Sequence, residues 1–574
     1  MDLQEIQETQ IWGLFEKGRN YHRLVGIPSD TDRNYRFYNG DQWEGAKLDG
    51  VEPVQKNFIK PIVKYKCAVI HDNLYAVNIS SLNFENLEFQ KEAKRYCEML
   101  NRYFMRVWER EKMDFKLREV TKDSAINDEG IIYVDFDKEL MLPKVEVIKK
   151  NDIFYGNEND ADIQNQPYIL IRKRMPVSNA IDYALTQGVS EDKARFIVGD
   201  TDNHEQSGDA SKQEVDNMAT IVFKFYKKHG EVHFSSATRY CDIVEDANTG
   251  LTRYPVAHFN WEAKEGSARG EGEVRYLIPN QIEVNKTEMR RVLTVKTQAY
   301  PQKVANISKI VNPNAVNTVG GVIKTDDQTV DDVRKIVGTI PPAQMSPDVV
   351  KLQEDLINVT RDLAGAGDTA TGQVNPESAS GRAILAVQQA SQSPITEQKE
   401  SCKNLIEDFA LIGIDYLTVF SVDGLKLEEK DTDENGEEII KIVHVPQSVL
   451  EQLKPYVKVD VTPKGVYDKF AQEQTIENLL LQGYFTAERV GELEVYESLL
   501  DDDSVAPKMK IKDAIARIRE EQKKIAQIQA QAQAMQQRAN QFLMGDPDSQ
   551  ADQMASAMEV PMEEEVMEDN PDDN

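Results

Sequence analysis

Two histidines, His229 and His233, have the four-residue spacing of zinc ligands on one face of a helix. They stand in the order His-Gly-Glu-Val-His, which is not the His-Glu-x-x-His order of metalloproteases. Gly230 and the strand pattern on both sides predict a turn between two strands instead. We therefore expect no metal site at this pair.

Three glycines, Gly266, Gly270 and Gly272, superficially resemble a nucleotide-binding loop. A phosphate cradle needs a strand leading into the first glycine and a Lys-Ser/Thr pair after the last, and this sequence has neither. We expect a flexible joint before the helix that follows. No Ser/His/Asp order, nucleophile elbow or spaced carboxylate pair appears either, so the sequence predicts no enzyme activity and no cofactor.

The four cysteines have no paired spacing, so they predict neither a zinc site nor a disulfide framework. They are Cys67, Cys97, Cys241 and Cys402. We expect them to be small buried hydrophobic residues in a reducing compartment. No apolar run reaches the roughly 20 residues that cross a bilayer, and the acidic start is no signal peptide, which predicts a cytoplasmic location and no membrane partner.

The formal net charge of the 574-residue chain is −30, which argues against a protein that coats nucleic acid. It does not exclude a protein that surrounds DNA without holding it. The last 30 residues, 545–574, contain 11 acidic residues and no basic one, and we expect them to be disordered. Repulsion of DNA, binding to a basic partner and a purely solubilising role remain open for this tail.

Basic residues gather on one predicted helix, Tyr276 to Ala299. They are Lys286, Arg290, Arg291 and Lys296. In so acidic a chain, a phosphate backbone passing nearby would explain such a face. Salt bridges to neighbouring acidic helices are an equally good explanation.

The elements that must position these residues begin with an α+β domain of about 250 residues. Periodicity predicts helices over 6–24, 57–70 and 86–126 and strands over 131–136, 143–148, 168–171, 219–226 and 232–234, with aromatic residues around an Asn-Gly turn at 35–43 and an exposed insertion at 199–217.

The basic helix is followed by a small α/β insert over 301–342. Its expected elements are strands near 303–305 and 321–323 and a short helix near 330–336. A second helix, Ser346 to Leu363, follows, so the insert lies at the tip of a helical hairpin. The glycines from Gly365 stop that helix, a polar segment follows, and a long helix over 380–420 is expected to kink at Pro394.

Beyond the long helix the sequence predicts a β-hairpin from 424–427 and 438–445 and a last strand at 457–461. The remainder to about Phe542 is helical in pattern. The chain is too long for one core, so several domains are expected.

From about Gly13 to Phe542 the order of elements resembles the portal proteins of tailed bacteriophages. Six segments carry the resemblance: Tyr38-Asn39-Gly40-Asp41-Gln42-Trp43; Asn57-Phe58-Ile59-Lys60-Pro61-Ile62-Val63; Gly130-Ile131-Ile132-Tyr133-Val134; Pro255-Val256-Ala257-His258-Phe259; Gly270-Glu271-Gly272-Glu273-Val274 running into Pro279-Asn280-Gln281-Ile282-Glu283-Val284-Asn285; and Ala370-Thr371-Gly372 to Ser380-Gly381-Arg382-Ala383-Ile384.

The resemblance implies the phage portal fold, an α+β fold with a wing, a two-helix stem, a small α/β clip, a tunnel loop leading into a long kinked helix, and a helical crown. The implied divisions are wing 1–265 and 380–461, stem helices 266–299 and 346–364, clip 300–345, tunnel loop 365–379, crown 462–543 and acidic tail 544–574.

The implied function is a ring, typically of twelve subunits, at one capsid vertex, through which double-stranded DNA is packaged and ejected. Such a protein nucleates the procapsid with the major capsid and scaffolding proteins. It docks the large terminase subunit at the clip and later the head-to-tail adaptor, and ATP hydrolysis belongs to the motor. The implied location is the virion, with the host cytoplasm during assembly.

The resemblance also implies residue roles. DNA-facing residues of the tunnel loop are Asp368, Thr369, Thr371, Gln373 and Asn375; basic channel residues are Lys286, Arg290, Arg291 and Lys296; partner-binding residues of the clip are Lys303, Lys309, Lys324, Arg334 and Lys335. Two alternatives remain: another structural virion component, such as an adaptor or scaffold, and a nucleic-acid-processing ring enzyme.

Overall fold

The computed structural model of the chain describes residues 8–46, 52–71, 73–81, 87–200, 217–318, 320–326, 332–341, 344–367, 393–432, 438–453 and 455–463. The chain divides into two units, Met1–Thr462 and Pro463–Asn574, and all described residues except Pro463 belong to the first. The expectations for most of the insertion, for the polar loop and start of the long helix, for the helical region after Pro463 and for the acidic tail therefore lie outside the described residues.

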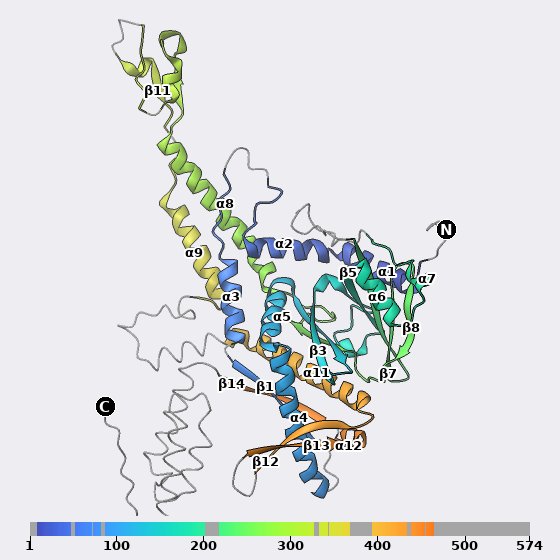
Figure 1. The fold of residues 1–574 in the computed structure, drawn as a ribbon. Coiled ribbons are helices and arrows are strands. Elements are labelled where there is room, and N and C mark those ends of the chain that lie inside the picture. The colour runs from blue at the N-terminus through green and yellow to red at the C-terminus, as the bar shows by residue number, and fades with distance from the viewer. Residues whose placement is uncertain are drawn as a thin grey trace, which may run out of the picture. The chain divides into compact units, whose positions relative to one another are not determined.

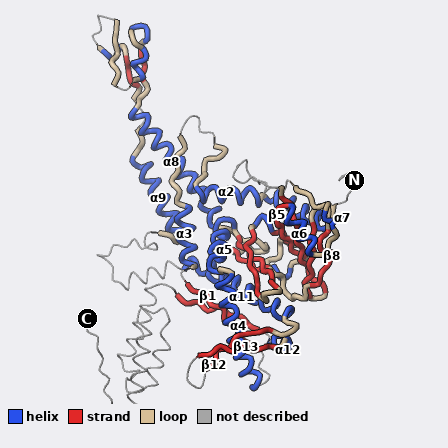
Figure 2. The backbone as a smooth tube through the Cα atoms, viewed as in Figure 1, coloured by secondary structure: helices blue, strands red, loops and turns tan. Residues whose placement is uncertain are grey.

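Helices and sheets both build the first unit, which confirms the expected mixture of helix and sheet (Figures 1 and 2). The α-helices are α1 (Gln10–Val25), α2 (Ile27–Asn39), α3 (Ile59–Ile70), α4 (Leu87–Arg110), α5 (Met113–Asn127), α6 (Val177–Thr186), α7 (Glu191–Ala194), α8 (Glu273–Ala299), α9 (Pro347–Leu363), α11 (Thr396–Phe420) and α12 (Gln447–Leu453). The strands are β1 (Asn73–Ser81), β2 (Glu129–Asp137), β3 (Leu142–Ile148), β4 (Ile153–Tyr155), β5 (Tyr168–Pro176), β6 (Met218–Lys228), β7 (Glu231–Ala237), β8 (Asp242–Asn248), β9 (Val256–Asn260), β10 (Lys303–Ala305), β11 (Val337–Thr339), β12 (Leu425–Thr432), β13 (Glu438–Val445) and β14 (Pro455–Pro463).

Two antiparallel sheets form the centre of the unit. One has the order β4-β5-β6-β7-β8, and the other has the order β3-β2-β9. Helix α1 packs on the larger sheet through Trp12 and Phe15, and the Phe15 ring meets Phe154 of β4 edge-on at 5.2 Å. Helices α5 and α11 pack against the smaller sheet, and the hydroxyl of Tyr416 on α11 donates to the carbonyl oxygen of Val134 at 3.1 Å.

Distant parts of the chain complete this unit. Strand β1 pairs with β14, nearly 400 residues later in the sequence, while β12 and β13 form the predicted hairpin. The last strand, expected over 457–461, is confirmed as β14. Its partner β1 was not predicted, because nothing local in a sequence says which distant segment a strand will pair with.

The single helix expected over 86–126 is wrong. The chain forms α4 and α5 there, separated at Lys112, whose φ of 51° lies in the left-handed region. A non-glycine residue in that conformation is unusual. Helix ends are identified in a sequence mainly from glycine and proline, and neither occurs at this break. The aromatic segment also differs from the expectation, since α2 continues through Tyr35 and Tyr38 to Asn39, and Gly40 with a φ of 99° ends it.

The small insert contains the expected strand at 303–305, now β10, but its partner is β11 at Val337–Thr339. No strand occurs at residues 321–323; the described segment 320–326 has only an isolated bridge from Thr325 to Ile310. Likewise, the expected short helix is a single 3-10 turn, Val333–Lys335, in its described part. Short polar elements such as these have too few periodic positions to identify from sequence.

The described part of the long helix begins with a 3-10 turn, Ser393–Ile395, and α11 starts directly after it at Thr396. Pro394 therefore stands ahead of α11 and not within it. A proline fits this position because the first residues of a helix have no intrahelical acceptor for their N–H groups.

Candidate functional site

Helices α8 and α9 form an antiparallel pair on either side of the small insert. The side-chain amide of Asn280 donates to the hydroxyl of Thr360 at 3.0 Å, and the amide of Gln353 donates to the carboxylate of Glu288 at 2.7 Å. The later residue of α8 contacts the earlier residue of α9, so the two helices run in opposite directions. Ser346 caps α9 through its hydroxyl, which accepts from the backbone N–H of Asp348, and Pro347 takes the first helical position.

The insert between these helices has a small core of its own, which we call the tip module (residues 303–341). Ile310, Val316 and Ile336 are buried against one another and form a cluster separate from the main core. Figure 1 draws the module, with its strand β11, beyond the C-terminal end of α8. The two helices therefore carry a compact piece that is stabilised by its own contacts.

Leu356 of α9 packs against the main core, but three other apolar residues whose spacing predicted this helix do not. Leu352, Val359 and Leu363 share one face and are 67%, 52% and 82% exposed, whereas the polar Gln353 and Thr360 are buried. Helix α8 likewise exposes apolar side chains, among them Tyr276, Val292, Leu293 and Val295. Apolar surface on two adjacent helices is unfavourable in water, and it is typical of a surface that another protein covers.

The basic residues of α8 are mostly paired with acids. Lys286 lies 2.7 Å from Glu283, Arg291 lies 3.9 Å from Glu288, and Lys296 lies 3.4 Å from Glu52. Two of these acids are on α8 itself and the third is in a loop. These three ion pairs therefore do not link α8 to neighbouring acidic helices, as the salt-bridge alternative expected. The fourth residue, Arg290, is exposed. Exposed pairs such as these are worth about 1 kcal/mol or less, so a phosphate is able to compete for them.

The predicted partner-binding cations all lie in the tip module and are exposed. They are Lys303, Lys309, Lys324, Arg334 and Lys335. One of them is tied to the module, because the ammonium group of Lys303 donates to the carbonyl oxygen of Val316 at 2.8 Å. Segment 300–345 has five basic and four acidic residues, a net charge of +1 in a chain of −30. The tip is thus weakly basic, unlike the chain as a whole.

A buried ionic cluster anchors the start of α8. Arg269 lies 2.8 Å from Glu158, pairs with Glu129, and donates to Nε2 of His22 at 2.9 Å. Glu129 has a fully buried side chain and also meets Nε2 of His258 at 3.1 Å. We call Arg269, Glu129, Glu158 and His22 the ionic cluster; it joins α1, β2, the loop after β4 and the segment before α8.

Charge in this cluster shifts the pKa values of its members in physically consistent directions. Burial raises the pKa of Glu129, but the Arg269 guanidinium and His258 outweigh burial and hold that pKa at about 2. Burial lowers the pKa of His22 to about 4, although Glu158 opposes the shift. The imidazole is therefore neutral at neutral pH, which fits its role as acceptor from Arg269.

Gly270 and Gly272 before α8 are closely packed, which argues against the flexible joint expected there, whereas a Cβ atom on Gly266 would meet open space. A Cβ atom on Gly270 would lie 2.6 Å from the carbonyl oxygen of Glu262, and one on Gly272 would lie 2.8 Å from the backbone nitrogen of Asp128. The Gly272 N–H donates to the Asp128 carboxylate at 2.7 Å. These glycines allow close approach of two backbones, which fixes where α8 begins.

The predicted end of α9 is confirmed, because Ala364 follows the helix and Gly365 has a φ of 69°. A left-handed glycine is a common helix end. The DNA-facing residues expected beyond it, Asp368, Thr369, Thr371, Gln373 and Asn375, all lie outside the described residues. Nothing in the structure therefore tests that part of the expected site.

The histidine pair belongs to a strand turn, as predicted. His229 and Gly230 form the turn between β6 and β7, and Nδ1 of His233 lies 2.5 Å from the carboxylate of Asp246. No cluster of three or more potential metal ligands occurs among the residues that the structure describes.

Among the described residues, no helix has the length and apolar character to span a membrane. Cys97, Cys241 and Cys402 are buried free thiols, and Cys67 is half-buried.

Comparison of the sequence with protein-family models and with curated proteins gives no match.

Proposed function

We propose that this chain is the portal subunit of a tailed bacteriophage, with the wing, stem, clip and crown divisions that the sequence resemblance implies. Twelve copies would form a ring at one capsid vertex, through which double-stranded DNA enters and leaves. In this role the protein has no active site of its own. It nucleates the procapsid and binds the large terminase subunit and then the head-to-tail adaptor.

The observation that carries the proposal is the antiparallel pair of α8 and α9 with the tip module between them. A stem and clip require two helices that leave a larger domain, carry a small separately folded piece and return. The contacts between Asn280 and Thr360 and between Gln353 and Glu288 supply the pairing. The separate cluster of Ile310, Val316 and Ile336 gives the tip its own core.

The exposed apolar faces of this pair support a ring of identical subunits. Burying a leucine side chain contributes roughly 1.5–3 kcal/mol, so Leu352 and Leu363 would contribute substantially at every contact between copies. A stem helix that packs only on its own chain would turn these leucines inward. In α9 they are exposed while Gln353 is buried, which is the arrangement expected when a second copy covers the outer face.

Charge supports the same function in a different way. A ring of chains that each have a net charge of −30 repels DNA, so duplex passing through it meets few deep binding wells. The cations of α8 are held in weak exposed pairs and would exchange between carboxylates and passing phosphates. The weakly basic tip would offer a different surface to the acidic or polar face of a motor protein.

The test is electron microscopy of the purified full-length protein, combined with assays for ATP hydrolysis and DNA cleavage. Closed rings with a central opening wide enough for duplex DNA and no enzymatic turnover would support the proposal. Rings that hydrolyse ATP or cut DNA would favour the ring enzyme instead. Single copies under all solution conditions, and also after co-expression with capsid and scaffolding proteins, would contradict the portal function.

A further inference from the structure

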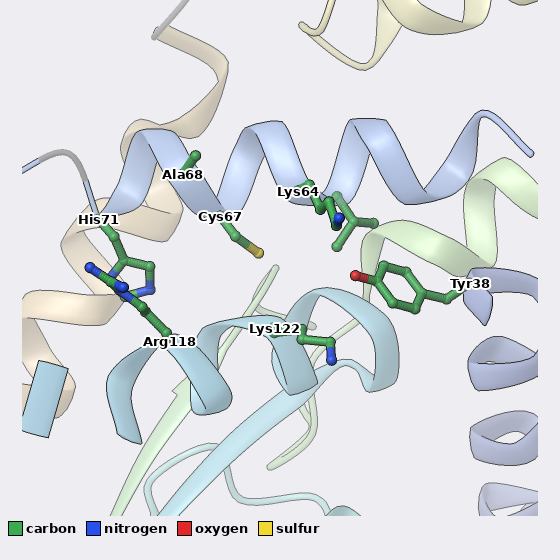
Figure 3. A pocket seen from close by; sticks show the side chains of 8 residues that line it. Tyr38, Lys64, Cys67, Ala68, His71, Arg118 and Lys122 are labelled. Atoms are coloured by element: carbon green, nitrogen blue, oxygen red, sulfur yellow. The ribbon is translucent and has the colours of Figure 1, made fainter. Parts of the chain in front are cut away.

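A groove lined by cations lies between α3 and α5. Lys64 and Cys67 come from α3, Arg118 and Lys122 come from α5, and Tyr38 comes from α2 (Figure 3). The hollow has a volume of about 520 Å³. Sequence patterns did not identify this groove, because its cations stand on the exposed faces of two ordinary amphipathic helices.

The three cations of this groove have no acidic partner among the described residues. Arg118 and Lys122 are four residues apart on the same face of α5, and Lys64 lines the opposite wall (Figure 3). Within the described part of the chain, none of the three forms an ion pair. The ammonium group of Lys122 lies over the ring of Tyr38, 5.5 Å from its centre. Acidic residues outnumber basic ones by 98 to 68, so three cations without a carboxylate around one hollow are not expected by chance.

The remaining wall of the groove adds a donor and no negative charge. Tyr38 is 4% exposed, and burial raises the pKa of its hydroxyl, which stays protonated and able to donate. Burial likewise raises the pKa of the Cys67 thiol to about 12, so that side chain is neutral. The carboxylate that raises the pKa of Cys67 further, Glu273, forms an ion pair with Lys66 at 2.7 Å.

We infer that this groove binds phosphate groups, through Lys64, Arg118, Lys122 and the hydroxyl of Tyr38. A guanidinium, two ammonium groups and a phenol offer more donors than the two oxygens of a carboxylate accept, whereas a phosphate has three or four oxygens. The volume exceeds that of one phosphate, so the rest of a nucleotide also fits. The source of the phosphate is either a free small molecule or a nucleic-acid backbone. This inference does not depend on the portal function.

Two binding measurements on the full-length protein test the inference. Equilibrium dialysis with radiolabelled inorganic phosphate counts free anion bound per chain, and fluorescence anisotropy with a labelled 12-nucleotide single-stranded DNA measures backbone binding. The variant Lys64→Gln/Arg118→Gln/Lys122→Gln should lose at least tenfold in affinity for the probe that the wild type binds. The salt dependence of DNA binding should also weaken, by about 0.7 in log–log slope for each lost phosphate contact.

A charge-matched control separates a site from a general effect of net charge. Lys94→Gln/Arg110→Gln/Lys144→Gln removes three exposed cations on α4 and β3, and it should bind like the wild type. Circular dichroism checks that both variants fold.

Loss of DNA binding alone assigns the groove to a nucleic-acid backbone, and loss of phosphate binding with it assigns the groove to single phosphate groups. Equal weakening by both variants overturns the inference. So does a wild type that binds neither probe, or competition by polyglutamate as efficient as competition by unlabelled DNA.

Discussion

Arg269 and Glu129 are charged groups without access to water, and their mutual contact makes their burial tolerable. Removing Glu129 takes one of two carboxylates from the buried guanidinium, which keeps Glu158 at 2.8 Å but loses its contact with Glu129. A buried donor left without its partner typically costs about 1–3 kcal/mol. Glu129 is the more critical partner because its side chain is fully buried and also meets His258. The position of α8 thus depends on residues that no stem or channel function would single out.

The variant Glu129→Gln should therefore lower the free energy of unfolding by about 1–3 kcal/mol, measured by chemical denaturation. Glu283→Gln is the matched control, since it removes a carboxylate from the exposed pair with Lys286 and should change stability by less than about 0.5 kcal/mol. Similar effects of the two variants would mean that the ionic cluster does not stabilise the fold.

His22 should make the stability of the fold sensitive to acid. Its pKa is about 4 in the folded protein and 6.5 ordinarily, so the unfolded chain binds a proton in that interval and the folded chain does not. Stability is therefore lost as the pH falls from about 6.5 to about 4, by up to about 3 kcal/mol from this residue. His22→Gln keeps an acceptor for Arg269 and does not titrate. Its stability should fall less steeply over that interval, and parallel curves for variant and wild type would contradict the assignment.

At the scale of elements, periodicity predicted α8, α9, α11 and most of the strands, because each buries or exposes a regular face. It did not predict the break at Lys112, where a lysine adopts a left-handed backbone. The ionic cluster could not be predicted from the sequence for another reason. Arg269 is 140 residues from Glu129 and 247 from His22 in the sequence, and only the folded chain brings them together.

The apolar face of α9 leads to a prediction about assembly. Leu352→Gln/Leu363→Gln should leave the folded chain intact, since both side chains are exposed, but it should abolish or strongly weaken ring formation. Analytical ultracentrifugation measures the assembly state and circular dichroism the fold. Leu24→Gln replaces a leucine that is 86% exposed on α1 and is the control. Assembly that is equally impaired in both variants, or in neither, would argue against α9 as a contact between copies.

The proposed portal function leads to a prediction about the tip module and the large terminase subunit. Arg334→Gln/Lys335→Gln should leave rings unchanged, because both side chains are exposed, and should weaken binding of the large terminase subunit at least tenfold. Surface plasmon resonance with immobilised rings measures this affinity, and Lys286→Gln on α8 is the control. Unchanged terminase binding by the tip variant would remove these two residues from the docking surface.

At the scale of the whole molecule, three properties meet in one chain: strong acidity, a projecting pair of helices with exposed apolar faces, and a small module at their end. Each occurs in unrelated proteins. Their combination fits the proposed portal subunit, whose charge would repel the DNA inside the ring and whose apolar faces would contact the next subunit. Repulsion of DNA from all sides and burial of every apolar face both require a closed ring. The proposed function therefore depends on assembly into such a ring.

Native mass spectrometry of the purified full-length protein tests this central claim most directly. The chain has a mass of 65.2 kDa, and we expect one dominant species at about twelve times that value, which the Leu352→Gln/Leu363→Gln variant converts to single chains. A wild type that remains at the mass of one chain at every concentration, with and without its capsid and scaffolding partners, would contradict the account.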